Sequence, residues 1–132
     1  MSPTSSEGLP IPTDAELSVL RVLWSKGPST VRQLHEALSQ ERDLGYTTVL
    51  KAVQVMLEKG LVDRDDSERS HVYRAAVAEG HTKGQLVSDL LAKAFAGSAS
   101  ELLVHALKAG RTKPAELDAI QRLLDEARKK RS

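Results

Sequence analysis

Residues 46–58 carry polar side chains whose types suit contact with the edges of DNA bases. Thr and Gln hydrogen-bond base edges, a Thr methyl group contacts a thymine methyl, and Lys reaches a guanine edge or a phosphate. No acidic residue precedes the last position of this segment, although its surroundings are rich in acids. The pattern predicts a helix that reads DNA, with an ordinary solvated helix face as the alternative. The candidate reading residues are Thr47, Thr48, Lys51 and Gln54.

Arginines in the segment that follows are candidates for contact with DNA phosphates. They are Arg64, Arg69 and Arg74, and they belong to a strand, turn, strand pattern. Arginine side chains that meet the DNA backbone contribute affinity without sequence preference. The same pattern holds acidic side chains at four of the six positions from 63 to 68, and these are poor neighbours for phosphate.

Carboxylates near the start of the chain could suggest acid–base chemistry, but their positions favour a structural role. Asp14 and Glu16 lie beside a predicted helix start, where acids complement the helix dipole and cap the backbone. The sequence shows no Gly-rich phosphate loop and no nucleophile–base arrangement. We therefore expect no enzymatic activity.

Metal, cofactor and membrane chemistry are also not expected. The chain has no Cys, which excludes disulfides and thiolate metal sites and fits a reducing compartment such as the cytoplasm. No apolar run approaches the roughly 20 residues of a membrane span, so direct membrane insertion is not expected. The four His residues include no close pair with metal-ligand spacing. They are His35, His71, His81 and His105.

Composition points to a small, mainly helical protein. The 132 residues are 40% hydrophobic but only 3% aromatic, so the core must consist of Leu, Val and Ala. The net charge is +1, and residues 13–80 hold nine basic against eleven acidic side chains. Bulk charge therefore does not indicate a nucleic-acid partner, and DNA binding must be argued from where the charges lie.

The order of elements in the first part of the chain predicts a winged helix-turn-helix at residues 13–78, after a flexible tail at 1–12. Thr13 and Glu16 form a capping box that begins a first helix. Ser29 or Thr30 begins a second, short helix, and a third spans about 46–58. A β-hairpin over residues 61–76 follows. In such a fold the third helix enters the major groove of DNA.

The second part, residues 82–130, predicts a helical dimerisation region with helices at about 82–95, 98–108 and 114–130. Three apolar stripes fall within about fifty residues, which so short a helical segment would struggle to bury alone. We expect a homodimer. The alternative is a monomer in which these helices pack against the winged helix-turn-helix, the head of the chain. The apolar residues are Leu86, Leu90, Leu91, Phe95, Leu102, Leu103, Leu107, Leu117, Ile120, Leu123 and Leu124.

A set of short motifs agrees in type and spacing with one repressor family. The motifs are Thr13-Asp14-Ala15-Glu16-Leu17 with Leu23-Trp24, Thr30-Val31-Arg32-Gln33-Leu34, Tyr46-Thr47-Thr48-Val49-Leu50-Lys51, Lys59-Gly60-Leu61-Val62 and Tyr73. They resemble the penicillinase and methicillin-resistance repressors (the BlaI/MecI family), which also include copper-responsive members. The likeness covers nearly all of residues 13–128 and is strongest before residue 76.

The resemblance implies a cytoplasmic homodimeric repressor that binds a palindromic, double-stranded operator DNA. It gives residues at the positions of Thr47, Thr48 and Lys51 the DNA-facing role, and Tyr46 lies in the same matching stretch. It also implies a dimer formed by the C-terminal helices. Because the chain lacks Cys, metal sensing of the copper-responsive type is not expected.

The resemblance further suggests how such a repressor is released. In the antibiotic-resistance members a membrane sensor-protease leads to cleavage at an asparagine–phenylalanine bond, and His105-Ala106 occupies that place here. The hypothesis is cleavage near residues 104–107 after exposure to a β-lactam. The alternatives are a repressor gated by a small ligand between head and dimer helices, and a winged-helix module that binds another protein.

Overall fold

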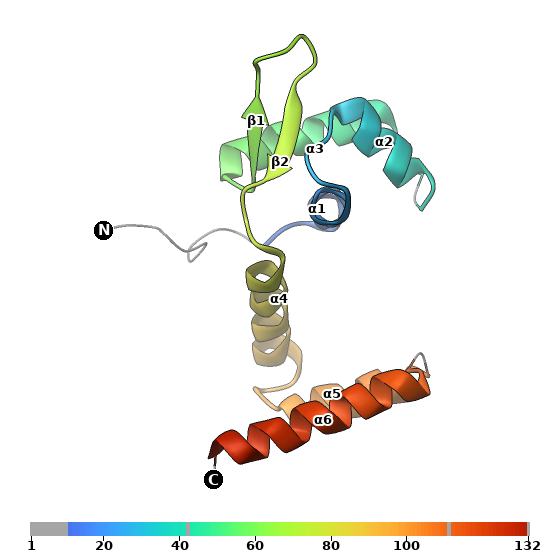
Figure 1. Ribbon diagram of the computed structural model, residues 1–132, viewed down its shortest axis with the longest axis vertical. Coiled ribbons are helices and arrows are strands. Elements are labelled where there is room, and N and C mark those ends of the chain that lie inside the picture. Colours follow the sequence, from blue (N-terminus) through green and yellow to red (C-terminus); the bar gives the residue numbers. More distant parts are fainter. Residues whose placement is uncertain (1–10, 42, 111, 132) are drawn as a thin grey trace, which may run out of the picture. The chain divides into compact units, whose positions relative to one another are not determined.

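The computed structural model describes residues 11–41, 43–110 and 112–131 (Figure 1). Most of the predicted flexible tail, residues 1–12, lies outside these ranges. The chain divides into two compact units, one ending at Val87 and one beginning at Ser88. Each unit is described by itself.

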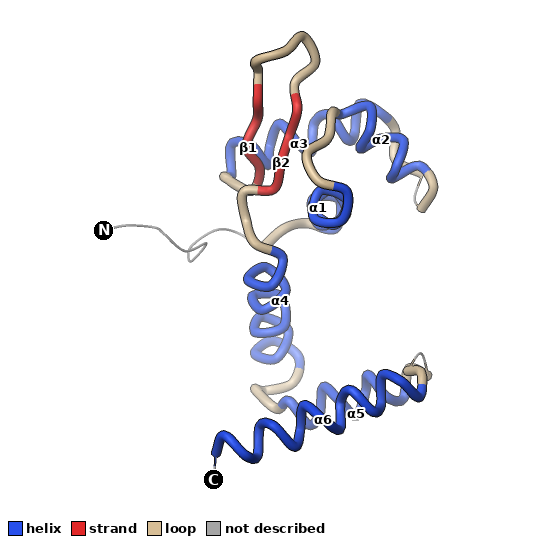
Figure 2. The backbone as a smooth tube through the Cα atoms, in the orientation of Figure 1, coloured by secondary structure: helices blue, strands red, loops and turns tan. Residues whose placement is uncertain are grey.

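The first unit is a winged helix-turn-helix, as predicted, in which helices surround the base of a two-stranded hairpin (Figures 1 and 2). The strands are antiparallel, with Arg64 opposite Tyr73 and Asp63 opposite Arg74. The elements of the unit are α1 (Asp14–Lys26), α2 (Val31–Ser39), α3 (Tyr46–Lys59), β1 (Val62–Asp65), β2 (Val72–Ala75) and the start of α4 (Glu79–Ala94).

Local capping signals explain where the first helices begin. The Thr13 side chain accepts the Glu16 N–H at 3.2 Å, and the Glu16 carboxylate accepts the Thr13 N–H at 3.0 Å. Thr30 and Gln33 form the same reciprocal pair at the start of α2, at 3.2 and 2.9 Å. Each box satisfies two backbone N–H groups that have no partner within the helix. Of the two predicted starts for α2, Thr30 is the cap.

The segment between α1 and α2 is tied to the hairpin. The Ser29 N–H donates to the Tyr73 carbonyl at 2.9 Å, and the Tyr73 N–H donates back to the Ser29 carbonyl at 2.8 Å. Ser29 therefore adds one bridge beside β2, which fixes the base of the wing against the helices. Tyr73 itself is buried.

The core of this unit lies between α1, α2, α3 and the base of the hairpin. An apolar stripe of α3 faces it, with Val49, Val53 and Met56 fully buried. Burial of this stripe turns the polar face of α3 to solvent. The other core residues include Val19, Leu20, Leu23, Leu34, Leu38, Leu61 and Val62.

Helix α4 begins at Glu79, three residues earlier than the predicted start at Thr82. Thr82 is 1% exposed and its N–H bonds the Ala78 carbonyl at 3.1 Å, so it lies in the first turn. The Trp24 indole N–H donates to the Val77 carbonyl at 3.0 Å, just before the helix. These contacts fix the first turn of α4 on the helical head.

The second unit contains the rest of α4, then α5 (Ala99–Lys108) and α6 (Pro114–Arg131). Ala96 and Gly97 take positive φ angles of 48° and 83° between α4 and α5, and the Ser98 hydroxyl caps α5 by accepting the Glu101 N–H at 3.1 Å. None of the described residues of α5 or α6 is buried. Among the described residues no single helix has the length and apolar character of a membrane span. Helices α4 and α5 have them only when taken together, and this pair is bent by 97°.

Candidate nucleic-acid interface

Helix α3 presents an exposed polar face opposite its buried apolar stripe. The candidate reading residues Thr47, Thr48, Lys51 and Gln54 are all exposed, and Tyr46 at the first position is 48% exposed. Lys51 has no hydrogen bond or ion pair among the described residues, so its ammonium group is available to a ligand. The structure thus brings the predicted α3 residues together on one accessible surface.

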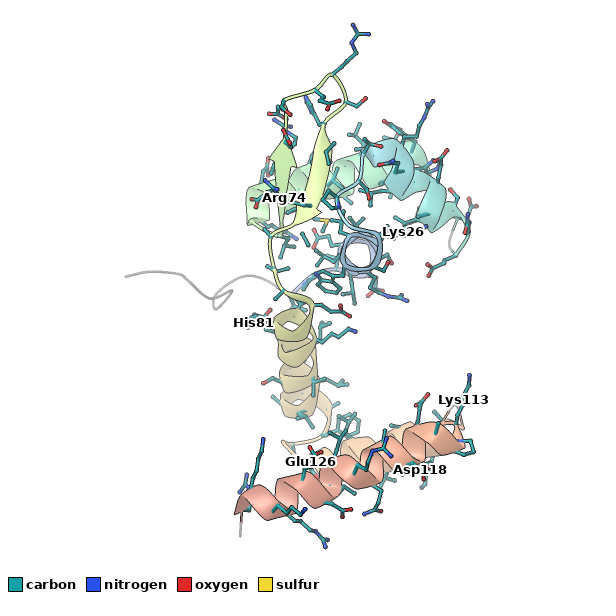
Figure 3. All side chains as sticks on the ribbon, in the orientation of Figure 1. Lys26, Arg74, His81, Lys113, Asp118 and Glu126 are labelled. Atoms are coloured by element: carbon teal, nitrogen blue, oxygen red, sulfur yellow. The ribbon has the colours of Figure 1, made fainter. Side chains whose placement is uncertain are left out.

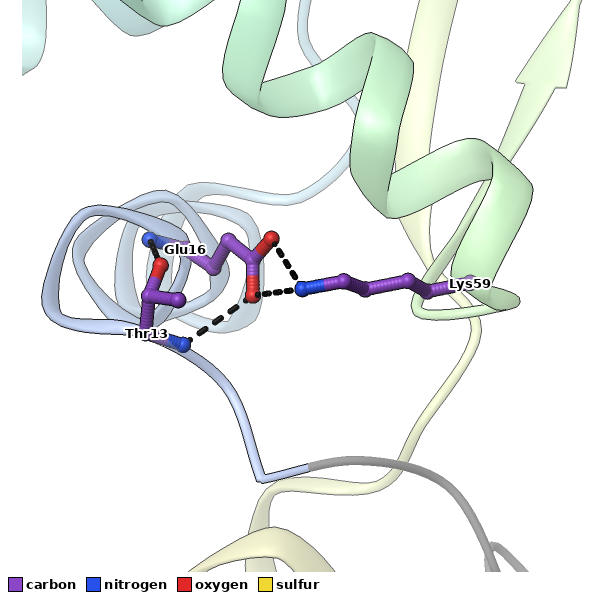
Figure 4. A network of polar contacts seen from close by, with 3 residues as sticks. All are labelled: Thr13, Glu16 and Lys59. Carbon is purple, nitrogen blue, oxygen red and sulfur yellow. Dashed lines mark hydrogen bonds and ion pairs between the residues drawn. The ribbon is translucent and has the colours of Figure 1, made fainter.

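A groove of about 300 Å³ runs along one side of this face, between α3 and the start of α1. Thr47, Thr48 and Lys51 line it from α3, and Thr13 and Glu16 line it from α1. Glu16 is 4% exposed, and its carboxylate is neutralised by an ion pair with Lys59, at 2.8 Å from Oε2 to Nζ (Figure 4). The acid therefore does not leave an unpaired negative charge next to Lys51.

A second groove, of about 460 Å³, runs along the other side of α3, between this helix, the start of α2 and the wing. Tyr46, Arg32 and His71 are exposed residues that line it. Neither Arg32 nor His71 is among the DNA contacts predicted from the sequence. Arg32 lies outside the apolar face of the second helix. Nothing in the sequence indicates that it lines the same groove as His71, 39 positions later.

The wing arginines are exposed but differ in their partners. Arg64 pairs with Asp66, at 2.7 Å from Nε to Oδ1, and hydrogen bonds with the Tyr73 and Asp66 side chains raise the pKa of its guanidinium. Asp66 also lies 3.6 Å from the His71 ring. Part of the positive charge of Arg64 is thus already compensated within the wing.

Arg74 and Arg69 are placed differently from Arg64. Arg74 extends from β2 (Figure 3), opposite Asp63 in the strand register, so it lies on the other face of the hairpin from Arg64. Arg69 lies in the exposed tip. A hydrogen bond from the Ser67 N–H, at 2.9 Å, is the main cause that lowers the pKa of Asp65, followed by the Ser67 side chain and the charge of Arg74. The arginines therefore do not form one patch with the α3 face.

The predicted dimerisation residues lie on α4, α5 and α6 and are exposed or half-buried throughout. Large exposed side chains include Leu117 at 46%, Leu123 at 63% and Leu124 at 47%. Leu86 belongs to the first unit and the others to the second. His105 and Ala106, the candidate cleavage position, are exposed residues of α5, and the His105 ring lies 5.6 Å from that of Phe95.

Comparison with known proteins gives a consistent family signal. The family model described as "Penicillinase repressor" matches residues 12–126. The transcriptional regulator BlaI of Mycobacterium tuberculosis is 41% identical over 119 residues, which cover 86% of this chain and 82% of that protein. The methicillin resistance regulatory protein MecI of Mammaliicoccus sciuri is 20% identical over 113 residues, which cover 86% and 92%. The solution structure of monomeric Bacillus licheniformis BlaI with the blaP half-operator is 23% identical, with a TM-score of 0.49, over 55% of this chain and 89% of that one.

Proposed function

Because the chain belongs to the penicillinase repressor family, whose relatives above are transcriptional regulators, we propose that it represses transcription by binding double-stranded operator DNA. The observation that carries the proposal is the exposed face of α3. It holds Thr47, Thr48, Lys51 and Gln54 without an acidic side chain before Glu58, in a head that otherwise has more acids than bases. No cofactor is required for this function.

In the proposed complex α3 enters the major groove. Thr47, Thr48, Lys51 and Gln54 contact base edges, since these side chains are exposed on one ridge of α3, which borders the groove towards α1. The backbone of the DNA then lies beside the ridge. The groove towards the wing offers Arg32 and His71 to phosphates, with Tyr46 at its edge.

The wing contributes unequally to this proposed contact. Arg69 and Arg74 are exposed, and neither forms an ion pair with another described residue. They are therefore the better candidates for contact with DNA phosphates. Arg64 would have to exchange its short contact with Asp66 for one with DNA. We therefore expect Arg64 to add less affinity than Arg69 or Arg74.

The protein acts as a homodimer in this proposal. Support comes from the exposed apolar side chains of α4 to α6 together with the lack of any buried residue in the described parts of α5 and α6. A second chain would cover these faces and present a second head to a palindromic operator. Linkage of the heads raises the affinity of the pair well above that of one head.

The deciding experiment is a binding titration of the purified protein, near physiological salt concentration, with DNA from the intergenic region upstream of its own gene. Scrambled DNA of the same length is the control, and both are titrated across a salt series. We expect tight, selective binding that weakens steeply as salt releases condensed counterions. Equal affinity for both DNAs, or none, would instead favour a winged-helix module that binds another protein.

Release from the operator is proposed to follow cleavage near residues 104–107, begun by a membrane sensor-protease in the presence of a β-lactam. The exposure of His105 and Ala106 supports this step. Both residues lie within α5, so the helix must unwind locally before a protease can bind the segment in an extended form. Immunoblots of the native host before and after induction test this step. A full-length band that persists while the target gene is expressed would favour gating by a small ligand.

A further inference from the structure

Glu16 has two partners at once. Its carboxylate accepts the Thr13 N–H at 3.0 Å, which caps α1, and both of its oxygens accept Lys59 Nζ, at 3.1 and 2.8 Å (Figure 4). Lys59 is the last residue of α3 and lies 43 positions away in the sequence. One nearly buried carboxylate thus joins the start of α1 to the end of α3.

The second capping box shows that the cap alone does not need a charge. At the start of α2, Gln33 fills the role of Glu16, and its amide oxygen accepts the Thr30 N–H at 2.9 Å. Glu16 is 4% exposed, and a carboxylate on so buried a residue is costly unless it is paired. The charge of Glu16 is therefore accounted for by Lys59 and not by the capping of α1.

The place of this pair relates it to the DNA-facing surface. Glu16 lines the same groove as Thr47, Thr48 and Lys51. At the far end of α3, Gly60 takes a left-handed conformation and the Leu61 N–H bonds the Met56 carbonyl at 2.9 Å, so the chain turns immediately into β1. The ion pair joins α3 to α1 at this end, where it is placed to oppose a slide or rotation of α3 on α1.

We propose that the Glu16–Lys59 pair is a positioning device that fixes α3 so that its polar face meets the right base edges. The inference rests on the proposed DNA-binding function and names residues that act through α3 without touching DNA. Recognition groups must be held within roughly 0.5 Å and 10–20° of the productive geometry. Loss of the pair should therefore reduce discrimination between sequences more than affinity for DNA in general.

The variants Glu16→Gln and Lys59→Met test this inference. Glu16→Gln keeps the capping oxygen, as Gln33 does, and removes only the charge. Lys59→Met keeps the aliphatic stem, and Lys59→Arg retains the cation as the conservative control. Lys83→Met is the matched control, because Lys83 forms an exposed ion pair with Glu79, at 2.6 Å, away from α3.

The measurement is the ratio of affinities for operator and scrambled DNA, at a temperature where circular dichroism shows every variant folded. We expect Glu16→Gln and Lys59→Met each to lower the ratio by about tenfold, within the range known for residues that act through others. Lys59→Arg and Lys83→Met should keep the wild-type ratio. The salt dependence of binding should stay unchanged, because no phosphate contact is lost.

The double variant Glu16→Gln with Lys59→Met distinguishes an effect on the position of α3 from an effect on the stability of the fold. Removal of both partners leaves no unpaired buried charge, so the urea midpoint should recover relative to Lys59→Met alone. The affinity ratio should stay as low as in either single variant. Recovery of the ratio together with stability would show a merely structural pair and overturn the inference.

Two further results would also overturn it. An unchanged affinity ratio in both single variants would show that the Glu16–Lys59 ion pair has no effect on sequence recognition. An equal loss of affinity for both DNAs, with a shallower salt dependence in Lys59→Met, would make Lys59 itself a phosphate contact. If the wild-type protein fails to discriminate between the two DNAs, the proposed function fails and this inference falls with it.

Discussion

Lys51 has no hydrogen bond or ion pair among the described residues, unlike three other cations of the winged-helix unit. Lys59 pairs with Glu16, Arg64 with Asp66 and Lys83 with Glu79. An exposed lysine gains little from a surface ion pair, so the lack of one has no large effect on folding. It does leave the ammonium group of Lys51 free to be desolvated against a base or a phosphate.

Lys51→Ala should weaken operator binding by about 1–3 kcal/mol if the side chain reads a base, with little effect on scrambled DNA. The measurement is isothermal titration calorimetry with both DNAs. Lys26→Ala, an exposed lysine at the end of α1, is the control and should bind as the wild type does. An equal loss on both DNAs would make Lys51 a phosphate contact.

Asp65 should titrate below its ordinary pKa of 3.8, because the Ser67 N–H and hydroxyl stabilise its charged form. With the folded pKa lowered, its contribution to stability is present above the unfolded pKa and is lost as the pH falls through the folded pKa. Carboxyl 13C NMR titration measures the midpoint, and the urea-unfolded protein provides the reference. A folded midpoint at or above that reference would contradict the assigned hydrogen bonds.

At the scale of elements, the sequence predicts best what neighbouring residues decide. The capping box at Thr13 and the stop at Gly60 are local signals, and α1 and α3 follow them within a residue or so. Helix α4 begins before Thr82 because the first turn is held by contacts with the head, which no local signal reports. Arg32 and His71 share a groove only after Tyr73 of β2 pairs with Ser29, just before α2, and no local signal in the sequence indicates this pairing.

Gly60→Ala should destabilise the protein by about 1–2 kcal/mol, because Gly60 has φ 82° and a Cβ is strained there. Gly84→Ala makes the same chemical change inside α4, where an added Cβ meets nothing within 4 Å. It should stabilise the protein by about 0.5–1 kcal/mol. Urea unfolding at one fixed protein concentration measures both, and equal effects of the same sign would refute this account.

At the scale of the whole molecule, the two units differ in how much they bury. The winged-helix unit has a continuous core, whereas α5 and α6 bury none of their described residues and leave leucines exposed. A helical segment of this size gains too little from its own contacts to offset the entropy of ordering it. A second chain of the same sequence is the simplest source of the missing contacts.

Leu123→Glu should convert the proposed homodimer to a monomer, because it puts a charge among the exposed leucines of α6. Light scattering after size exclusion measures the mass. Affinity for a full palindromic operator should fall by about 100-fold or more as the second head is lost. Ala115→Glu adds the same charge in the first turn of α6, outside the stripe of Leu117, Ile120, Leu123 and Leu124, and should keep the wild-type mass. A dimeric Leu123→Glu variant would place the interface elsewhere.

The hydrogen bond from Trp24 to Val77 also makes the molecule its own optical probe. Trp24 is the only tryptophan of the chain, and its half-buried indole lies where the wing ends and α4 begins. Indole fluorescence shifts to longer wavelength when water reaches the ring. The emission of unlabelled protein therefore reports whether the first turn of α4 stays docked on the head.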